Sequence, residues 1–592
     1  MKRNIALGIA GALLLVAAIV AYDMYRLSAQ ELLWGYRTLW LLLSAWGGLV
    51  LLGSGWLAKE NTWRWLGLSA GSSVLLGIGF PDIIPVPWLL FVGFVPLLIV
   101  ESEARQQGKR WGVVYWYAYQ TFVLWNIIAT YWVSNSSLGA GTVAILANSF
   151  LMCIPFILFH HTAKNAPRLA YGSFVFYWIT FEYLHQNWDL TWPWLTLGNG
   201  FAEYYHWVQW YEYTGVFGGS LWVLVANVLV FHLFTTWRKN GGIAWSKLMQ
   251  LGSLIIVPIV GGMIWYYNYQ EQGTPSEVVV VQPNYEPHYV KFRVPESKQI
   301  EEFIQLSKEK MTDATAYLVF PESSFGYVEI DELSSYRSIR KLKAFLADYP
   351  NVQLVTGANA YNVFEENEPH SEAVRSRQGR NGKMIYFETI NAALQINSTS
   401  DSIPLYRKSK LVPGPEIFPF KKLFFFLKPL VESIGGTTAG IATQKQRSVF
   451  ASAQGRVAPI ICYESVFGEF HAGYVRKGAQ AGFIMTNDGW WDNTAGHRQH
   501  LRFASLRAIE TRRSIARSAN TGISAFVNQR GDILQATDYD EPIAIRDTIL
   551  MNDRITFYVI WGDMIARLSM FISILFVLNA FAKGWMGRVG AK

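Results

Sequence analysis

Cysteine and charge are both scarce in this chain. Only two of its 592 residues are cysteine, Cys153 and Cys462, so a framework of several disulfides is excluded. Cys153 lies inside an apolar run, so pairing with Cys462 is not expected, and cysteine usage leaves the redox compartment open. Charged residues make up 16% of the chain, against about a quarter in soluble proteins. A wholly soluble protein is therefore not expected.

Long apolar runs are abundant instead, and they are unevenly distributed. Residues 1–270 consist of such runs, residues 273–550 have the composition of a soluble domain, and residues 555–592 begin with another run. This pattern predicts a polytopic membrane domain of about nine helices, a globular domain, and a C-terminal transmembrane helix with a cytoplasmic tail. The expected spans are 5–22, 38–57, 65–80, 87–101, 112–133, 141–160, 169–186, 215–236, 248–267 and 556–582.

Lysine and arginine gather in alternate loops between these spans, and such loops face the cytoplasm. The other loops carry only Arg26 and Arg37, so the globular domain is expected outside the cytoplasm. The first run has the pattern of a signal peptide, but the further apolar runs favour a signal-anchor that is retained in the protein. Much of the net charge of +8 sits in these loops and implies no nucleic-acid partner. The cytoplasmic loops and tail carry Lys2, Arg3, Lys59, Arg64, Arg105, Lys109, Arg110, Lys164, Arg168, Arg238, Lys239, Lys247, Lys583, Arg588 and Lys592.

The globular part alternates between strand and helix patterns. Short β-branched runs end in polar residues, and helical patterns such as "ESKQIEEFIQLSKEKMTD" lie between several of them. This alternation predicts an α/β domain whose site lies at strand ends. The expected strands lie within 275–284, 316–323, 351–359, 391–396, 457–465, 481–488 and 523–532.

Three polar residues of this domain can form a covalent catalyst together. Glu322 ends the run in "VFPES", Cys462 ends "PIICYE", and Lys408 lies in "PLYRKSK". The cysteine would attack a carbonyl as thiolate, the lysine ammonium would lower the thiol pKa and stabilise the oxyanion, and the glutamate would move the proton. Each residue alone has an ordinary explanation, as a buried structural cysteine, a solvated glutamate or a surface lysine.

These motifs resemble the carbon–nitrogen hydrolase (nitrilase) superfamily. The order "PES", "YRK" and "CYE" matches its Glu-Lys-Cys triad, and "TNDGWW" (486–491) and "RSANTGIS" (517–524) are similar to its later motifs. The resemblance implies an αββα sandwich. It also implies that Glu322 is the general base, Lys408 the cation that supports the oxyanion, and Cys462 the nucleophile.

Three further motifs are "LVPGPE" (411–416), "FEYL" (181–184) and "WPWLTLGN" (192–199). They resemble motifs of the apolipoprotein N-acyltransferase family. The resemblance implies acyl transfer from a phospholipid, typically phosphatidylethanolamine, to the N-terminal amine of an S-diacylglyceryl-cysteine lipoprotein. A cysteine thioester would be the intermediate, without metal or cofactor. The protein would lie in the bacterial cytoplasmic (inner) membrane with its catalytic domain on the periplasmic side.

The same family resemblance assigns supporting residues. Glu416 corresponds to a second essential glutamate, and Tyr463 and Glu464 occupy the Tyr-Glu positions after the nucleophile. Trp490 and its neighbour Trp491 are expected either to form a wall of the active site or to lie in the core.

The chain also departs from the family pattern, which leaves the shape of the lipid and lipoprotein pockets open. Lys410 stands where His or Arg is common, and Gly414-Pro415 replaces Phe-Gly. Phe292 stands where Trp is often found, and "WWD" (490–492) replaces Trp-Phe-Gly.

A phenylalanine-rich segment, residues 416–436, also carries three lysines. Interfacial segments combine these residues more often than buried ones do, so we expect a loop that dips into the outer leaflet and guides acyl chains. A core helix with a lysine-bearing solvent face is the alternative. The guiding residues would be Phe418, Phe420, Phe424, Phe425 and Phe426.

Several other charged residues remain ambiguous. Glu182 is a functional candidate because it is ionisable near a span end, or it simply lies at the water interface. Five arginines along one helical pattern suggest a salt-bridged surface or, less simply, contact with phospholipid head groups. They are Arg502, Arg507, Arg512, Arg513 and Arg517.

Three functional hypotheses remain. The first is the lipoprotein N-acyltransferase, the second a membrane-tethered amidase or nitrilase acting on a small extracytoplasmic substrate, and the third a non-catalytic receptor. The intact triad argues against the third hypothesis. The phenylalanine-rich segment and the many spans argue against the second.

Overall fold

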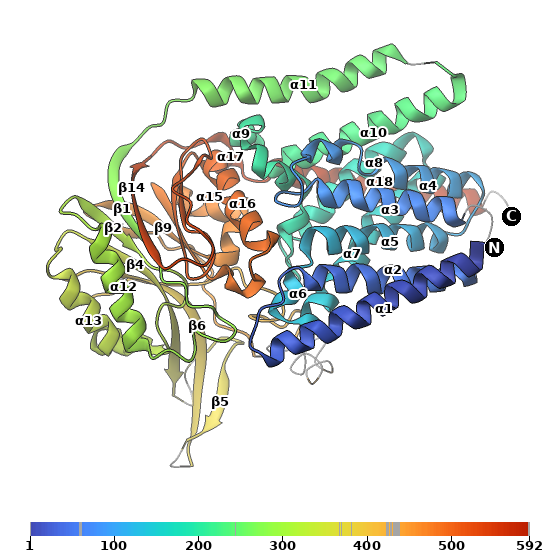
Figure 1. The fold of residues 1–592 in the computed structure, drawn as a ribbon. Helices are drawn as coiled ribbons and strands as arrows, with labels where there is room; N and C mark the ends of the chain where they lie inside the picture. Colours follow the sequence, from blue (N-terminus) through green and yellow to red (C-terminus); the bar gives the residue numbers. More distant parts are fainter. Residues whose placement is uncertain are drawn as a thin grey trace.

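The computed structural model describes residues 2–57, 62–242, 244–365, 368, 370–379, 382–421, 426, 429 and 439–589. It has two parts, a helical bundle and a β-sandwich (Figure 1). Both chain termini lie at the end of the bundle that is far from the sandwich (Figure 1).

Each predicted span contains helix in the structure. Six helical segments among the described residues are long and apolar enough to cross a membrane. The helix α11 lies along one side of the bundle (Figure 1), where Trp222 of α10 donates to the Leu254 carbonyl of α11 at 2.7 Å. The helices are α1 (Lys2–Ala29), α2 (Arg37–Leu57), α3 (Thr62–Ile78), α4 (Val95–Gln106), α5 (Trp111–Thr130), α7 (Leu138–Asn165), α8 (Ala170–Leu184), α10 (Val216–Asn240), α11 (Trp245–Asn268) and α18 (Met564–Val589).

The apolar run of the last span suggested one continuous helix, but the structure has an interrupted one. It divides into α17 (Phe557–Trp561) and α18 at Gly562, whose φ is +55°. A Cβ on this glycine would lie 2.5 Å from Glu469 Oε1, so only glycine fits here without strain. Hydropathy alone does not reveal such a break.

The sandwich consists of two sheets. One has the order β14-β1-β2-β4-β6-β5, with β3 beside β4 and β7 beside β6, and the other has the order β13-β12-β11-β10-β9-β8. The strands are β1 (Thr274–Gln282), β2 (Thr315–Val319), β3 (Val328–Glu329), β4 (Gln353–Phe364), β5 (Arg375–Gln378), β6 (Met384–Ile396), β7 (Leu405–Arg407), β8 (Phe450–Ser452), β9 (Gly455–Ile461), β10 (Ala481–Thr486), β11 (Ser514–Ala519), β12 (Ala525–Val527), β13 (Ile533–Leu534) and β14 (Ile543–Met551).

Strand alternation builds both faces of the first sheet. In β1, Val278 and Val280 join the core shared with the second sheet, whereas Val279 and Val281 pack toward the helices α12 (Glu296–Lys310) and α13 (Arg337–Leu346). The helices α15 (Gly468–Arg476) and α16 (Ala495–Thr511) lie between the second sheet and the bundle (Figure 1). The expected α/β class and αββα arrangement are therefore confirmed.

The expectation of surface arginines after residue 500 is wrong. The helix α16 ends at Thr511, Arg512 has a left-handed φ of +49°, and β11 follows. Arg502 alone of the five is partly exposed, with its Nε 3.6 Å from Asp82 Oδ2. The other four are fully buried: Arg507, Arg512, Arg513 and Arg517.

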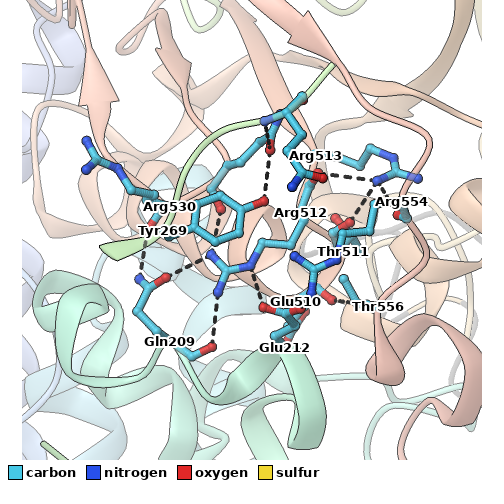
Figure 2. Close-up of polar contacts among 12 residues, drawn as sticks. Gln209, Glu212, Tyr269, Glu510, Thr511, Arg512, Arg513, Arg530, Arg554 and Thr556 are labelled. Carbon is cyan, nitrogen blue, oxygen red and sulfur yellow. Dashed lines mark hydrogen bonds and ion pairs between the residues drawn. The ribbon is translucent and has the colours of Figure 1, made fainter. Parts of the chain in front are cut away.

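One of these buried arginines, Arg512, joins the sandwich to the bundle (Figure 2). Arg512 Nε donates to Glu212 Oε2 at 2.7 Å, and Arg554 donates to Glu212 Oε1 at 2.6 Å. Arg512 also donates to Gln209 Oε1 at 2.8 Å, and its guanidinium lies 4.2 Å from the ring centroid of Tyr269. A buried charge needs such partners to offset its desolvation.

Candidate active site

The nucleophile candidate lies on a sharp turn. Cys462 follows β9 and opens a short 3-10 helix, with φ at +48°, a conformation that is rare for residues other than glycine. Glu464 holds this turn, because its carboxylate accepts from the Ile461 N–H (2.9 Å), the Ser409 N–H (2.7 Å) and the Tyr406 hydroxyl (2.6 Å). The turn and the segment that carries Lys408 are therefore fixed to each other.

The structure brings Lys408 and two glutamates together. Lys408 Nζ lies 3.2 Å from Glu322 Oε1 and 2.7 Å from Glu416 Oε1, and its side chain is 1% exposed. Asn391, in the middle of β6, donates from Nδ2 to Glu322 Oε1 at 2.7 Å. Sequence reasoning missed Asn391; its only signal was a polar residue in an apolar strand.

Burial and charge set the protonation states around Cys462. Burial raises the pKa of the Cys462 thiol, the Glu322 carboxylate raises it further, and Lys408 opposes both, with a net result well above the usual range. Burial lowers the pKa of Lys408, but the carboxylates of Glu322 and Glu416 raise it by more. Lys408 therefore lowers the thiol pKa, as expected from the sequence, but burial and Glu322 raise it by more.

Lys291 is a second lysine near the site. Its side chain is buried, and Nζ donates to the Glu322 backbone carbonyl at 3.3 Å. Burial lowers the pKa of Lys291 to about 8, against a smaller opposing effect of Glu322. Sequence reasoning noted only its neighbour Phe292, because a lysine beside an aromatic residue carries no sign of burial.

A buried polar chain supports the turn from behind. His500 contacts Asp488 Oδ1 through Nδ1 at 3.0 Å, and its Nε2 lies 2.8 Å from Ser465 Oγ and 3.2 Å from the Cys462 carbonyl oxygen. Arg517 forms an ion pair with Asp488. Burial raises the pKa of Asp488, but Arg517 and His500 hold it well below its usual range.

The expected aromatic residues have different surroundings. Tyr463 is buried and donates to the Thr191 carbonyl at 2.8 Å, which links the turn to the bundle. Phe292 and Trp490 are exposed, with ring centroids 6.4 Å apart. Trp491 instead packs on Trp132 of the bundle at 4.7 Å.

The first two helices reach the sandwich beside these rings. Asp492, which stands where the family pattern has glycine, adopts a φ of +55°. Its carboxylate accepts from the Trp34 N–H at 3.0 Å and the Gly35 N–H at 2.8 Å, both in the turn between α1 and α2. This departure from the pattern therefore makes a contact with the turn between α1 and α2.

The phenylalanine-rich segment is only partly described. Phe418 is buried, the Phe420 N–H donates to Asp189 Oδ2 at 3.1 Å, and Phe426 is 63% exposed. Phe424 and Phe425 lie outside the described residues. A cavity of about 510 Å³ lies beside this segment, lined in part by Leu411, Ile417, Phe418 and Phe420.

Within the described ranges, no cluster of three or more His, Cys, Asp or Glu side chains could hold a metal ion. The chemistry available here is that of a thiol, a carboxylate and an ammonium. Together they suit acyl transfer through a covalent thioester.

Comparison with known proteins gives two family matches. The apolipoprotein N-acyltransferase N-terminal domain matches residues 72–229, and carbon-nitrogen hydrolase matches residues 278–550. The helices α1 and α2 precede both ranges.

Curated relatives match most of the chain. The apolipoprotein N-acyltransferase of Chlorobaculum tepidum is 28% identical over 525 residues, covering 86% of this chain and 95% of that protein. The one of Geobacter metallireducens is 25% identical over 506 residues, covering 84% and 91%. Among solved structures, Saccharomyces cerevisiae Nit3, of the nitrilase superfamily, aligns with 47% of this chain and 90% of its own at 15% identity and a TM-score of 0.32.

Proposed function

The chain belongs to the apolipoprotein N-acyltransferase family, and we propose that it transfers a fatty acyl chain from a membrane phospholipid to the N-terminal amine of a diacylated lipoprotein. The contact of Lys408 with both Glu322 and Glu416, beside the turn that carries Cys462, is the observation that carries this proposal. Phosphatidylethanolamine is the expected donor, and an S-diacylglyceryl cysteine is the expected acceptor.

The first half-reaction loads the cysteine. The thiol proton of Cys462 passes to Glu322 as the sulfur attacks the ester carbonyl of the phospholipid. The Lys408 ammonium stabilises the oxyanion that forms. The ester bond then breaks, Glu322 returns the proton to the departing lysophospholipid oxygen, and the acyl chain remains as a thioester.

The second half-reaction releases the acyl chain as an amide. The lipoprotein amine attacks the thioester, Glu322 accepts the amine proton, and the sulfur leaves and is reprotonated. Water must be kept from the thioester during the interval. The buried Tyr463 and the close contact of the sandwich with the bundle would help to exclude water from the thioester.

The location in a membrane favours acyl transfer over hydrolysis of a small amide. The sandwich is tethered to apolar helices at both ends, so a lipid donor and a lipidated acceptor stay at high local concentration. We further propose that the domain faces the periplasm and that the phenylalanine-rich segment guides acyl chains. Replacing Phe426 with Ser should then slow loading from phospholipid more than loading from a short soluble ester.

The proposal is tested by mass spectrometry of the purified protein. Incubation with phospholipid should add one acyl mass to Cys462, and a diacylated lipopeptide should then remove it and gain a third chain. Cys462→Ala is the control and should stay unmodified. Hydrolysis of small amides without any lipid adduct would favour the amidase instead.

A further inference from the structure

A second cavity, of about 650 Å³, lies where the sandwich meets the bundle. It is bordered by α15, by the residues that follow α8, and by Asp563 just before α18. Its lining is strongly basic, with five cationic side chains: Lys410, Lys445, Arg447, Arg476 and Lys477.

The carboxylates in the lining do not balance these cations. Only Glu469 and Asp563 contribute negative charge. Glu469 is already paired with Arg567 at 3.0 Å, and Asp563 accepts from the Tyr558 hydroxyl at 2.6 Å. The cavity therefore keeps an excess of positive charge.

The contacts of two of these cations indicate that, among the residues that the structure describes, the cavity lacks an anionic partner for them. The Arg447 guanidinium lies 3.8 Å from the Phe470 ring centroid, yet within the described part of the chain its Nε is buried without a hydrogen-bond partner. Lys410 Nζ lies 4.7 Å from the Phe467 ring centroid and donates to the Gln186 carbonyl at 2.8 Å. Burial and the nearby Arg447 lower the pKa of Lys410 to about 8, against opposing effects of Glu464, Asp563 and Glu469.

The cavity lies near the ends of two helices of the bundle. Gln186 and Asn187 lie just after α8, which ends at Leu184, and Asp563 directly precedes α18, which is long and apolar enough to cross a membrane. Both ends are on the side of the sandwich, opposite the chain termini (Figure 1). Basic side chains next to the ends of membrane-spanning helices attract anionic lipid.

We propose that this cavity binds the phosphate of an anionic glycerophospholipid from the leaflet that faces the sandwich, at a site separate from Cys462. Lys408 and Lys410 are two residues apart but serve different sites. Lys408 contacts the catalytic carboxylates, whereas Lys410 contacts Gln186 in the lining of this cavity. The bound headgroup would help hold the segment that carries both lysines. The proposal rests on membrane insertion alone and not on acyl transfer.

Native mass spectrometry of the full-length protein in detergent tests this proposal, with phosphatidylglycerol as the probe and phosphatidylcholine as the neutral comparison. The variant Lys445→Ala/Lys477→Ala removes two exposed lysines of the lining, so folding should not suffer. Its affinity for phosphatidylglycerol should fall about tenfold or more, while weak binding of phosphatidylcholine stays unchanged.

The matched control is Lys308→Ala/Lys310→Ala, which removes the same charge from exposed positions of α12. This variant should bind phosphatidylglycerol as the unmodified protein does. Equal binding by both variants, equal loss in both, or displacement of the lipid by millimolar inorganic phosphate would overturn the assignment. None of these results depends on the Cys462 adduct, so this proposal and the proposed reaction can fail separately.

Discussion

At the residue scale, the site depends on how one lysine is shared between two carboxylates. Lys408 is buried between Glu322 and Glu416, and Asn391 is the neutral donor that also reaches Glu322. A hydrogen bond to a charged group contributes about 1.5–3 kcal/mol. The amide of Asn391 should therefore affect how Glu322 is held for proton transfer.

Two substitutions of Asn391 separate the effect of its hydrogen bond to Glu322 from the effect of a charge at this position. Asn391→Ala should slow loading of Cys462 by about tenfold or more, because Glu322 loses a donor. Asn391→Asp should slow it further, because a third carboxylate would compete for one ammonium, and lower pH should partly restore the rate. Single-turnover loading, measured by mass spectrometry, gives these rates. An Asp variant as active as the Ala variant would contradict this account of the charge cluster.

Lys291 provides a test by pH. With its pKa lowered to about 8, it is an ammonium below that pH and neutral above it. We expect this charge, beside the Glu322 backbone carbonyl, to help stabilise the negative charge that develops during attack, so loading should decline as pH rises through about 8. In Lys291→Met this decline should disappear and the rate at pH 7 should be lower.

The stability of the same variant should change in the opposite direction. The depressed pKa means that burying the charged lysine destabilises the fold at neutral pH and ceases to do so as pH rises above about 8. Lys291→Met should therefore keep or raise the melting temperature at pH 7. A large drop in melting temperature would show that Lys291 is mainly structural.

The short motifs around Glu322, Lys408 and Cys462 allowed these residues to be predicted, because each motif is local in sequence. Asn391, Lys291 and His500 were not predicted, since their importance comes from contacts across the fold. Nothing local distinguishes a buried lysine or asparagine from an exposed one.

At the scale of elements, hydropathy predicted the helices and strands better than their interruptions. The apolar runs placed the spans and the sheet, but the break at Gly562 depends on the approach of Glu469 from another helix. The arginines after residue 500 were predicted to lie on the surface, because the sequence does not distinguish a buried charge from an exposed one. Their partners Glu212 and Asp488 lie 300 and 29 residues away along the chain.

The junction of Figure 2 tests the energetic role of these arginines. Arg512→Met should destabilise the protein by about 3–5 kcal/mol, because Glu212 would lose a buried partner. The double variant Arg512→Met/Glu212→Met should be less destabilised, since Arg554 is partly exposed and can turn to water. Thermal unfolding in detergent measures both. If the double variant were the less stable one, the pair would be contributing net stability rather than satisfying a buried charge.

At the scale of the whole molecule, the arrangement of the parts predicts which side of the membrane each one faces. The two termini and most of the basic loops lie at the end of the bundle opposite the sandwich (Figure 1). The sandwich should therefore face the periplasm. This orientation would put Cys462 near the leaflet from which an acyl chain would come.

Cysteine labelling tests the sidedness. In a Cys153→Ala/Cys462→Ala background, Lys308→Cys should react with a membrane-impermeant maleimide in intact spheroplasts, because position 308 is exposed on the sandwich. Lys583→Cys, exposed near the C-terminus, is the matched control and should react only after lysis. The reverse pattern would mean that the span count is wrong by one.

The central claim is that Cys462 carries the acyl chain between donor and acceptor, and the release of lysophospholipid before any acceptor is added tests it most directly. The account predicts a rapid burst of about one lysophospholipid per protein molecule, followed by a pause that ends when a diacylated lipopeptide is added. The absence of any release without acceptor, or a burst of the same size in Cys462→Ala, would contradict it.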